Sequence, residues 1–193
     1  MRTRNEEAYT EKKEQIMNAC FECFSERGLH GTGISAVAEY AGISKATLYV
    51  YFADLDSLIT ESTAYCMAKV EDEFMAKAPK SFAEVENFID EIPFWTAKTH
   101  GKKYRLMYQV YAHPKYIDYG KEFFAGVDER YSEYARTLEP KLNISSEIIT
   151  PLIFFFIRAC VHYALFEDEF YLKSQMQLLK KSIKLFVGKN LIK

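Results

Sequence analysis

The residues best suited to contact another molecule are concentrated in one short segment, which reads GISKATLYVYF from Gly42 to Phe52. Lys45 and the two tyrosine hydroxyls are groups that bind phosphate oxygens. The side chain of Thr47 and the edges of the rings can meet base edges or thymine methyls in a DNA groove. These residue types point to contact with a nucleic acid. The alternative is that both tyrosines only cover a small helical core.

The elements that would position these side chains form a helix-turn-helix pattern. Apolar spacing predicts a helix over 34–40, then a glycine turn, then a shorter helix over 45–51 that Ser44 can cap. Leu48 and Phe52 lie four residues apart and would anchor the second helix to the core. The lysine, the threonine and the tyrosines are then expected to project away from that anchor or from its edges.

The rest of the chain is also predicted to be helical, because proline and glycine are sparse and apolar residues recur at helical spacing. The expected fold class is all-α with about nine helices: an N-terminal three-helix helix-turn-helix domain over 1–54 and a C-terminal helical ligand-binding and dimerisation domain over 55–193. Asp54 can cap the helix that follows it. The helices predicted outside the helix-turn-helix are 9–27, 55–77, 82–98, 102–112, 116–138, 146–166 and 170–187, with breaks at Gly101, Pro114 and Pro140.

Composition gives weaker guidance. A formal net charge of -2 carries no overall signal for nucleic acid or for a membrane surface. The four cysteines do not form the framework of a secreted protein, so we expect a reducing, cytoplasmic location. The most apolar run, 148–166, is interrupted by Pro151, Arg158 and His162, which favours a helix buried between protein surfaces over a membrane span.

Several pieces of the first 58 residues match one known pattern together. Ile16, Ala19, Cys20, Cys23, Phe24 and Gly28 form a helical stripe, followed by Gly31–Thr32, Val37–Ala38, the segment AGISKATLYVYF and Leu58. This stretch resembles the N-terminal DNA-binding domain of the TetR (tetracycline-repressor) family of transcriptional regulators. The resemblance implies a palindromic double-stranded DNA operator as partner, with repression as the default. It also implies that Leu48 and Phe52 are core and that DNA is contacted by Ser44, Lys45, Ala46, Thr47, Tyr49, Val50 and Tyr51.

The sequence departs from the family pattern at two places. Gly33 stands where the family often has a threonine or serine helix cap, and we expect Thr32 to substitute for it. The family's phosphate-binding lysine near the start of the fourth helix is also missing, because this chain reads ADLDSL there. Through Phe52 the acidic side chains also slightly outnumber the basic ones, so this DNA-binding head is not basic and a shallow salt dependence of DNA binding is predicted. A flexible basic arm could compensate, formed by Arg2, Arg4, Lys12 and Lys13.

In the family the remaining helices bind a small-molecule effector and form a homodimer through the last two helices, so both partners are implied here. Composition suggests a pocket lined by rings for a hydrophobic or aromatic ligand. Arg158 and His162 lie four apart on an apolar helix and could receive an anionic or hydrogen-bonding ligand, or could form an internal or intersubunit ion pair. The candidate ligand-binding residues are Phe88, Trp95, Tyr104, Tyr108, Tyr111, Phe124, Tyr131, Phe155, Arg158 and His162.

Other constellations predict little chemistry. Cys20 and Cys23 form a C-x-x-C inside a helical stripe with no second ligand pair, which favours core packing over a metal site. No catalytic motif appears, so neither an enzyme nor a cofactor is expected. Three function classes remain: a ligand-responsive repressor, a DNA binder without an effector, and a helical small-molecule-binding protein whose DNA head is weakened or non-functional.

Overall fold

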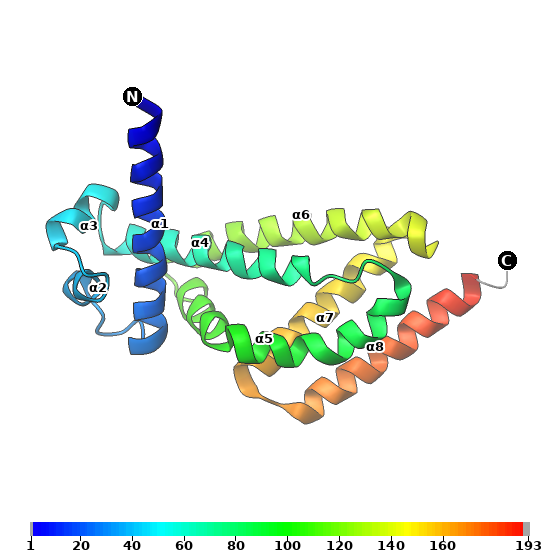
Figure 1. Cartoon of the computed structure of the whole chain (residues 1–193). Helices are drawn as coiled ribbons and strands as arrows, with labels where there is room; N and C mark the ends of the chain where they lie inside the picture. The colour runs from blue at the N-terminus through cyan, green and yellow to red at the C-terminus, as the bar shows by residue number, and fades with distance from the viewer. Residues whose placement is uncertain (1, 191–193) are drawn as a thin grey trace. The chain divides into compact units, whose positions relative to one another are not determined.

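The computed structural model describes residues 2–190, and side chains from 6 to 186. All regular secondary structure in that range is helical, which confirms the all-α prediction (Figure 1). Eight helices are present there instead of about nine. They are α1 (Arg2–Arg27), α2 (Ile34–Tyr40), α3 (Lys45–Tyr51), α4 (Leu55–Ala76), α5 (Phe82–Tyr111), α6 (Ile117–Leu142), α7 (Ser146–Phe166) and α8 (Glu169–Asn190).

The helix count differs because one expected break is absent. Residues 82–111 form a single helix that passes through Gly101. A Cβ atom at Gly101 would lie 3.2 Å from the carbonyl oxygen of Ala164 on α7, so the glycine permits a close helix approach. Pro140 likewise lies inside α6, in its last turn. The prediction of breaks at these two residues was wrong, and α1 also begins earlier than residue 9.

The chain divides into two compact units. The first unit comprises 1–73 and 105–121, and the second comprises 74–104 and 122–193. Helices α4, α5 and α6 each contribute residues to both units. The helix-turn-helix therefore belongs to a larger unit that also includes the end of α5 and the start of α6.

In the first unit, α2 packs against both α1 and α3. The helix starts follow the sequence signals. The Thr47 amide donates to Ser44 Oγ at 3.0 Å, and the Ser57 amide donates to Asp54 Oδ1 at 2.8 Å, which confirms both predicted caps. The core of this unit includes the apolar stripe of α1 and the two anchor residues of α3: Ile16, Cys20, Cys23, Phe24, Leu48 and Phe52.

Thr32 does not cap the start of α2, contrary to the expectation from the sequence. Gly33 is the N-cap residue of α2 and has no side-chain cap, but the Thr32 hydroxyl points the other way and donates to the Gly28 carbonyl at 2.7 Å. Gly28 ends α1 with φ +82°, a conformation that glycine adopts without strain. Thr32 therefore stabilises the end of α1 and leaves the first amides of α2 without a side-chain cap.

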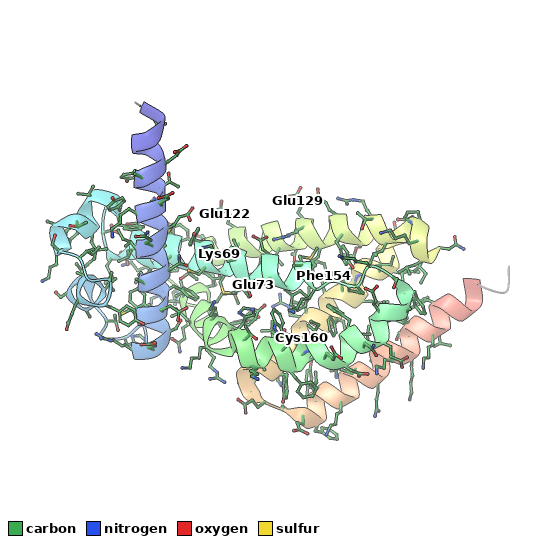
Figure 2. The ribbon with its side chains drawn as sticks, in the orientation of Figure 1. Lys69, Glu73, Glu122, Glu129, Phe154 and Cys160 are labelled. Atoms are coloured by element: carbon green, nitrogen blue, oxygen red, sulfur yellow. The ribbon has the colours of Figure 1, made fainter. Side chains whose placement is uncertain are left out.

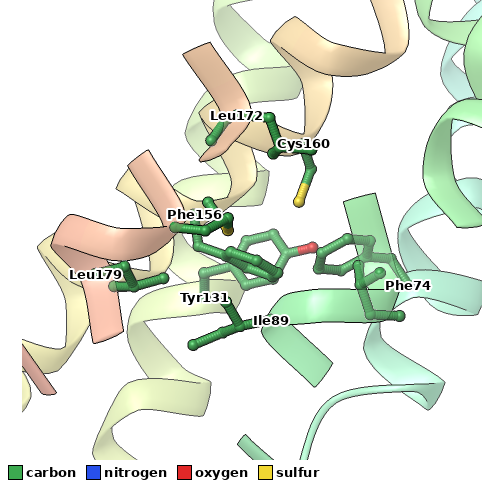
Figure 3. Packing of buried hydrophobic residues seen from close by; sticks show 10 residues of the cluster. Phe74, Ile89, Tyr131, Phe156, Cys160, Leu172 and Leu179 are labelled. Atoms are coloured by element: carbon green, nitrogen blue, oxygen red, sulfur yellow. The ribbon is translucent and has the colours of Figure 1, made fainter. Parts of the chain in front are cut away.

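The second unit contains the α7–α8 hairpin, whose helices lie side by side (Figure 1). Its core is rich in rings. Phe74 meets Tyr131 edge-on at 6.4 Å between centroids (Figure 3). Phe88 tilts against Phe156 at 5.3 Å. Helix α7 carries Cys160, which is fully buried (Figure 2). Among the described helices, α7 alone is long and apolar enough to cross a membrane by length and composition, a test that core helices also pass.

Candidate nucleic-acid interface and ligand cavity

Helix α3 presents a surface made largely of the residues expected to contact DNA. Leu48 and Phe52 are buried, as predicted for the anchor of this helix. Tyr49 is 55% exposed and Val50 is 67% exposed. Within the set expected to contact DNA, Ser44, Lys45 and Ala46 are also exposed, whereas Thr47 and Tyr51 are half-buried.

The half-buried members of this set are held in place by neighbours. The ring of Tyr51 stacks on that of Tyr9 from α1, with centroids 4.7 Å apart and planes 28° from parallel. The hydroxyl of Thr47 lies 2.9 Å from that of Ser44. Both contacts reduce the rotamer freedom of these side chains before any partner arrives. A surface ordered in this way loses less entropy on binding than a mobile one.

The acids at the start of α4 are already engaged inside the first unit. Asp54 caps the helix, and Asp56 accepts a 2.6 Å hydrogen bond from the hydroxyl of Tyr116. Lys115 Nζ lies 2.6 Å from the other carboxylate oxygen of Asp56. The bonds from Lys115 and then Tyr116 lower the pKa of Asp56. Burial and the bond to Asp56 raise the pKa of Tyr116 to about 12.

Sequence reasoning missed Lys115 and Tyr116 because no local pattern links them to Asp56, about 60 positions away. Lys115 places a cation near the start of α4. At the start of this helix the sequence lacks the phosphate-binding lysine of the TetR pattern. Lys115 neutralises an acid that would otherwise repel phosphate. The acidic composition of residues 1–60 therefore overstates the negative charge that these groups present.

The expected flexible basic arm is not what the structure has. The backbone is helical from Arg2, and Lys13 pairs with Glu61 at 2.7 Å while its ammonium lies 5.2 Å from the centre of the Phe52 ring. Lys13 is thus a structural link between α1, α4 and the end of α3. The side chains of Arg2 and Arg4 lie outside the described residues.

A cavity of about 120 Å³ lies within the second unit. Two of the candidate ligand-binding residues, Phe88 and Tyr131, are among its lining side chains. Of the other eight, Tyr108 and Tyr111 belong to the first unit. The six candidates of the second unit that lie outside this lining are Trp95, Tyr104, Phe124, Phe155, Arg158 and His162.

Arg158 and His162 have contacts inside the second unit. The Arg158 guanidinium lies 5.3 Å from the centre of the Phe124 ring. His162 Nε2 is 3.8 Å from Asp168 Oδ2, and its ring lies 4.2 Å from that of Tyr171. For His162 the internal carboxylate contact is therefore present, which is one of the two alternatives that the sequence left open.

The C-x-x-C thiols behave as core residues. Cys20 and Cys23 are fully buried, and burial raises the pKa of both, that of Cys20 to about 12. Buried thiols with raised pKa values are poor nucleophiles and poor metal ligands. Within the described part of the chain, no group of three histidine, cysteine or acidic side chains could hold a metal ion.

An anchored, exposed second helix that follows a tight turn is the geometry of a helix-turn-helix motif, and a longer helical region follows it here. A family model described as "Bacterial regulatory proteins, tetR family" matches residues 16–61. The chain is 41% identical to the HTH-type transcriptional regulator RutR of Escherichia coli K12 over 51 residues. This aligned stretch covers 26% of the chain and 24% of RutR. The matched region thus spans about a quarter of that relative. Residues 16–61 are therefore similar to the TetR family of bacterial regulatory proteins.

Solved structures show the same fold over nearly the whole chain. A TetR transcription regulator from Haloarcula marismortui matches with a TM-score of 0.70 at 17% identity, covering 92% of this chain and 98% of that one. FadR from Bacillus subtilis, solved in complex with stearoyl-CoA, matches with a TM-score of 0.60 at 16% identity, covering 90% and 96%. At these identities the comparison concerns the fold alone.

Proposed function

We propose that this chain is a ligand-responsive repressor that binds a palindromic DNA operator as a homodimer and is released by a small hydrophobic or aromatic ligand. The observation that carries the proposal is the surface of α3, where Lys45, Tyr49 and Val50 are exposed on a helix whose Leu48 is buried. The proposed target is a double-stranded DNA operator, and the proposed location of the protein is the cytoplasm. No catalytic role is proposed, because the matched relatives are regulators.

The engaged acids support the repressor over a protein with a non-functional DNA head. Lys115 and Tyr116 hold Asp56, and Lys13 holds Glu61. These contacts leave fewer free carboxylates in the unit that carries α3 than the composition suggests. We propose that Ser44, Lys45, Thr47, Tyr49 and Tyr51 supply polar DNA contacts, with Ala46 and Val50 packing against the groove.

The DNA experiment is selection of bound sequences from a random pool by the purified full-length chain. The informative variant is Tyr49→Ala, and the matched control is Tyr119→Ala, because Tyr119 is 54% exposed and belongs to the same compact unit. We expect a two-fold symmetric motif that Tyr49→Ala loses and Tyr119→Ala retains. If no motif is enriched, the protein with a non-functional head becomes the better explanation.

Salt dependence tests the role of Lys45 on the selected operator. A lysine that contacts one phosphate contributes about 0.9 to the slope of log affinity against log salt concentration. The proposed homodimer has two Lys45 residues, so Lys45→Ala should flatten the slope by about 1.8 and weaken binding across sequences to a similar extent. An unchanged slope would remove Lys45 from the phosphate contacts.

The proposed dimer interface is the α7–α8 hairpin. Leu178 and Leu185 of α8 lie seven residues apart on one helix face and are 54% and 64% exposed. Phe170, near the start of the same helix, is 85% exposed. Exposed apolar side chains on adjacent helices are what a helical subunit interface requires.

Sedimentation of Leu178→Glu tests this interface. Tyr119→Glu is the control, since Tyr119 is equally exposed at 54% but lies in the other unit. We expect Leu178→Glu to be monomeric at concentrations at which Tyr119→Glu and the unmodified chain are dimers. Dimerisation that survives Leu178→Glu and Leu185→Glu together would place the interface elsewhere.

Helix α4 is the proposed transmitter between ligand and DNA. Its first turn holds Asp56, which Tyr116 fixes, and its last turn contributes Phe74 and Met75 to the cavity lining. A ligand that favours a different position of this helix would alter the DNA head, and in a dimer would alter the distance between two heads. Half-sites one turn apart require a separation of about 34–36 Å. A change of a few ångströms would release the operator.

A further inference from the structure

The cavity in the second unit has a uniformly apolar lining. Within the described part of the chain its walls are aliphatic and aromatic side chains. The polar members of this lining are two tyrosines, Tyr131 and Tyr134, and they present almost no polar surface to the space. The Tyr134 hydroxyl already donates to the carbonyl oxygen of Pro79 at 2.9 Å. Among the side chains that the structure describes, none that lines the space is charged. A ligand group that needs a hydrogen bond would therefore lose its water there without compensation.

The size of the cavity restricts the ligand further. Pockets for drug-sized molecules measure roughly 300–1,000 Å³. This one measures about 120 Å³, close to the engineered apolar cavity of about 150 Å³ that stays dry and binds benzene. The rings of Phe88, Phe74 and Phe156 surround it, with Phe88 edge-on to Phe74 at 6.1 Å. Such walls offer edge and face contacts to another ring (Figure 3).

We propose that the effector is a small uncharged molecule with one aromatic or alicyclic ring and at most short alkyl substituents. The inference rests on the proposed function, because it names the ligand class of the effector site proposed there. The ring would fill the cavity and pack against the side chains of α4, α5, α6, α7 and α8 that line it. No part of the ligand needs to form a hydrogen bond with the lining.

An amphiphile with an anionic head is the main competitor, because a second pocket shares Phe82, Val85, Ile89 and Ile183 with the cavity and carries Lys180 and Lys184. The charge of Lys180 is already engaged, since its Nζ lies 2.7 Å from both carboxylate oxygens of Asp90. Lys184 lies 3.8 Å from Glu86. Two acids therefore match these two lysines, and the neighbouring pocket offers little net attraction to an anion.

The chain contains a matched pair of core leucines for the test. Leu172 and Leu179 both lie on α8, both are 3% exposed and both belong to one hydrophobic cluster (Figure 3). Only Leu179 lines the cavity. Leu179→Phe should fill the space, whereas Leu172→Phe adds the same volume to the core elsewhere. Leu179→Met is a volume-conserving variant that keeps the cavity open.

The experiment is isothermal titration calorimetry of the purified full-length chain, without DNA, using toluene, phenol and decanoate as probes. We expect toluene to bind with one site per chain. Phenol should bind at least about tenfold more weakly, because its hydroxyl finds no partner. Leu179→Phe should weaken toluene binding tenfold or more, while Leu172→Phe and Leu179→Met retain it. Circular dichroism checks that each variant is folded.

Three results would overturn the proposal: phenol binding as tightly as toluene, decanoate binding more tightly than toluene, or equal loss of toluene binding in the two phenylalanine variants. Because no DNA is present, failure of operator selection leaves these results intact. Toluene binding that does not weaken an operator complex would count against the regulatory function and not against the ligand class.

Discussion

Removing one hydroxyl group, in Tyr116→Phe, tests the contact that fixes the start of α4. The Tyr116 hydroxyl donates to Asp56 at 2.6 Å, and hydrogen bonds to charged groups contribute about 1.5–3 kcal/mol. The Asp56 side chain is 41% exposed, so water can replace part of the lost bond. We therefore expect the free energy of unfolding to fall by about 1 kcal/mol at pH 7, below the full value for a charged bond.

Lys115 gives the comparison within the same contact. Its side chain is 57% exposed, and exposed ion pairs contribute about 0–1 kcal/mol. Lys115→Ala should therefore cost less stability than Tyr116→Phe, even though the ion pair and the hydrogen bond have the same length. Denaturant unfolding of both variants, and of both in an Asp56→Asn background, measures the coupling of each residue to Asp56.

The pH dependence has a defined sign. The pKa of Asp56 in the folded protein is lowered from its ordinary value of 3.8. The contribution of the Asp56 carboxylate to the free energy of unfolding is therefore fully present above that value, and it is lost as the pH falls through the folded pKa. The effect of Tyr116→Phe should be constant from pH 7 to pH 5 and shrink below about pH 4. The reasoning is refuted if Tyr116→Phe costs as much in the Asp56→Asn background as in the unmodified chain.

Two further predictions concern backbone space and thiol access. Gly120→Ala should destabilise the protein in thermal unfolding, because a Cβ atom there would lie 2.8 Å from the Cβ atom of Tyr111. Gly126 lies on the same helix, and a Cβ atom there would meet nothing within 4 Å. Gly126→Ala should therefore stabilise the protein by about 0.5–1 kcal/mol. Burial raises the pKa of the Cys20 and Cys160 thiols. Both thiols should therefore resist a thiol reagent in the native protein and react with it on unfolding. Rapid labelling of either thiol in the native protein would contradict the buried core.

Local signals in the sequence predicted the helix-turn-helix well. The bounds of α2, α3 and α7 agree with the prediction at both ends. Each has a signal within a few residues, such as the Ser44 cap or the positive φ of Gly42 in the turn. Leu48 could be assigned to the core because its spacing from Phe52 is a property of one helix.

Features that depend on distant residues were not predictable in the same way. Gly101 appeared to be a helix break because its need for space arises from Ala164, more than 60 positions later. The ten candidate ligand residues were chosen by type, and ring side chains occur in plain core as well as in pockets. Which of them line a cavity depends on how α4 to α8 pack.

Charge illustrates why a whole-chain value can misdirect a functional argument. The net charge of -2 and the acids near α4 suggest a surface that repels DNA. Those acids act within the fold instead: Asp54 caps a helix, and Asp56 and Glu61 hold Lys115 and Lys13. Phosphate responds to the charges that remain exposed near it, because exposed charges farther than a Debye length of about 8–10 Å are screened. The DNA affinity of this head should therefore follow the exposed side chains of α3 more closely than the composition of the chain.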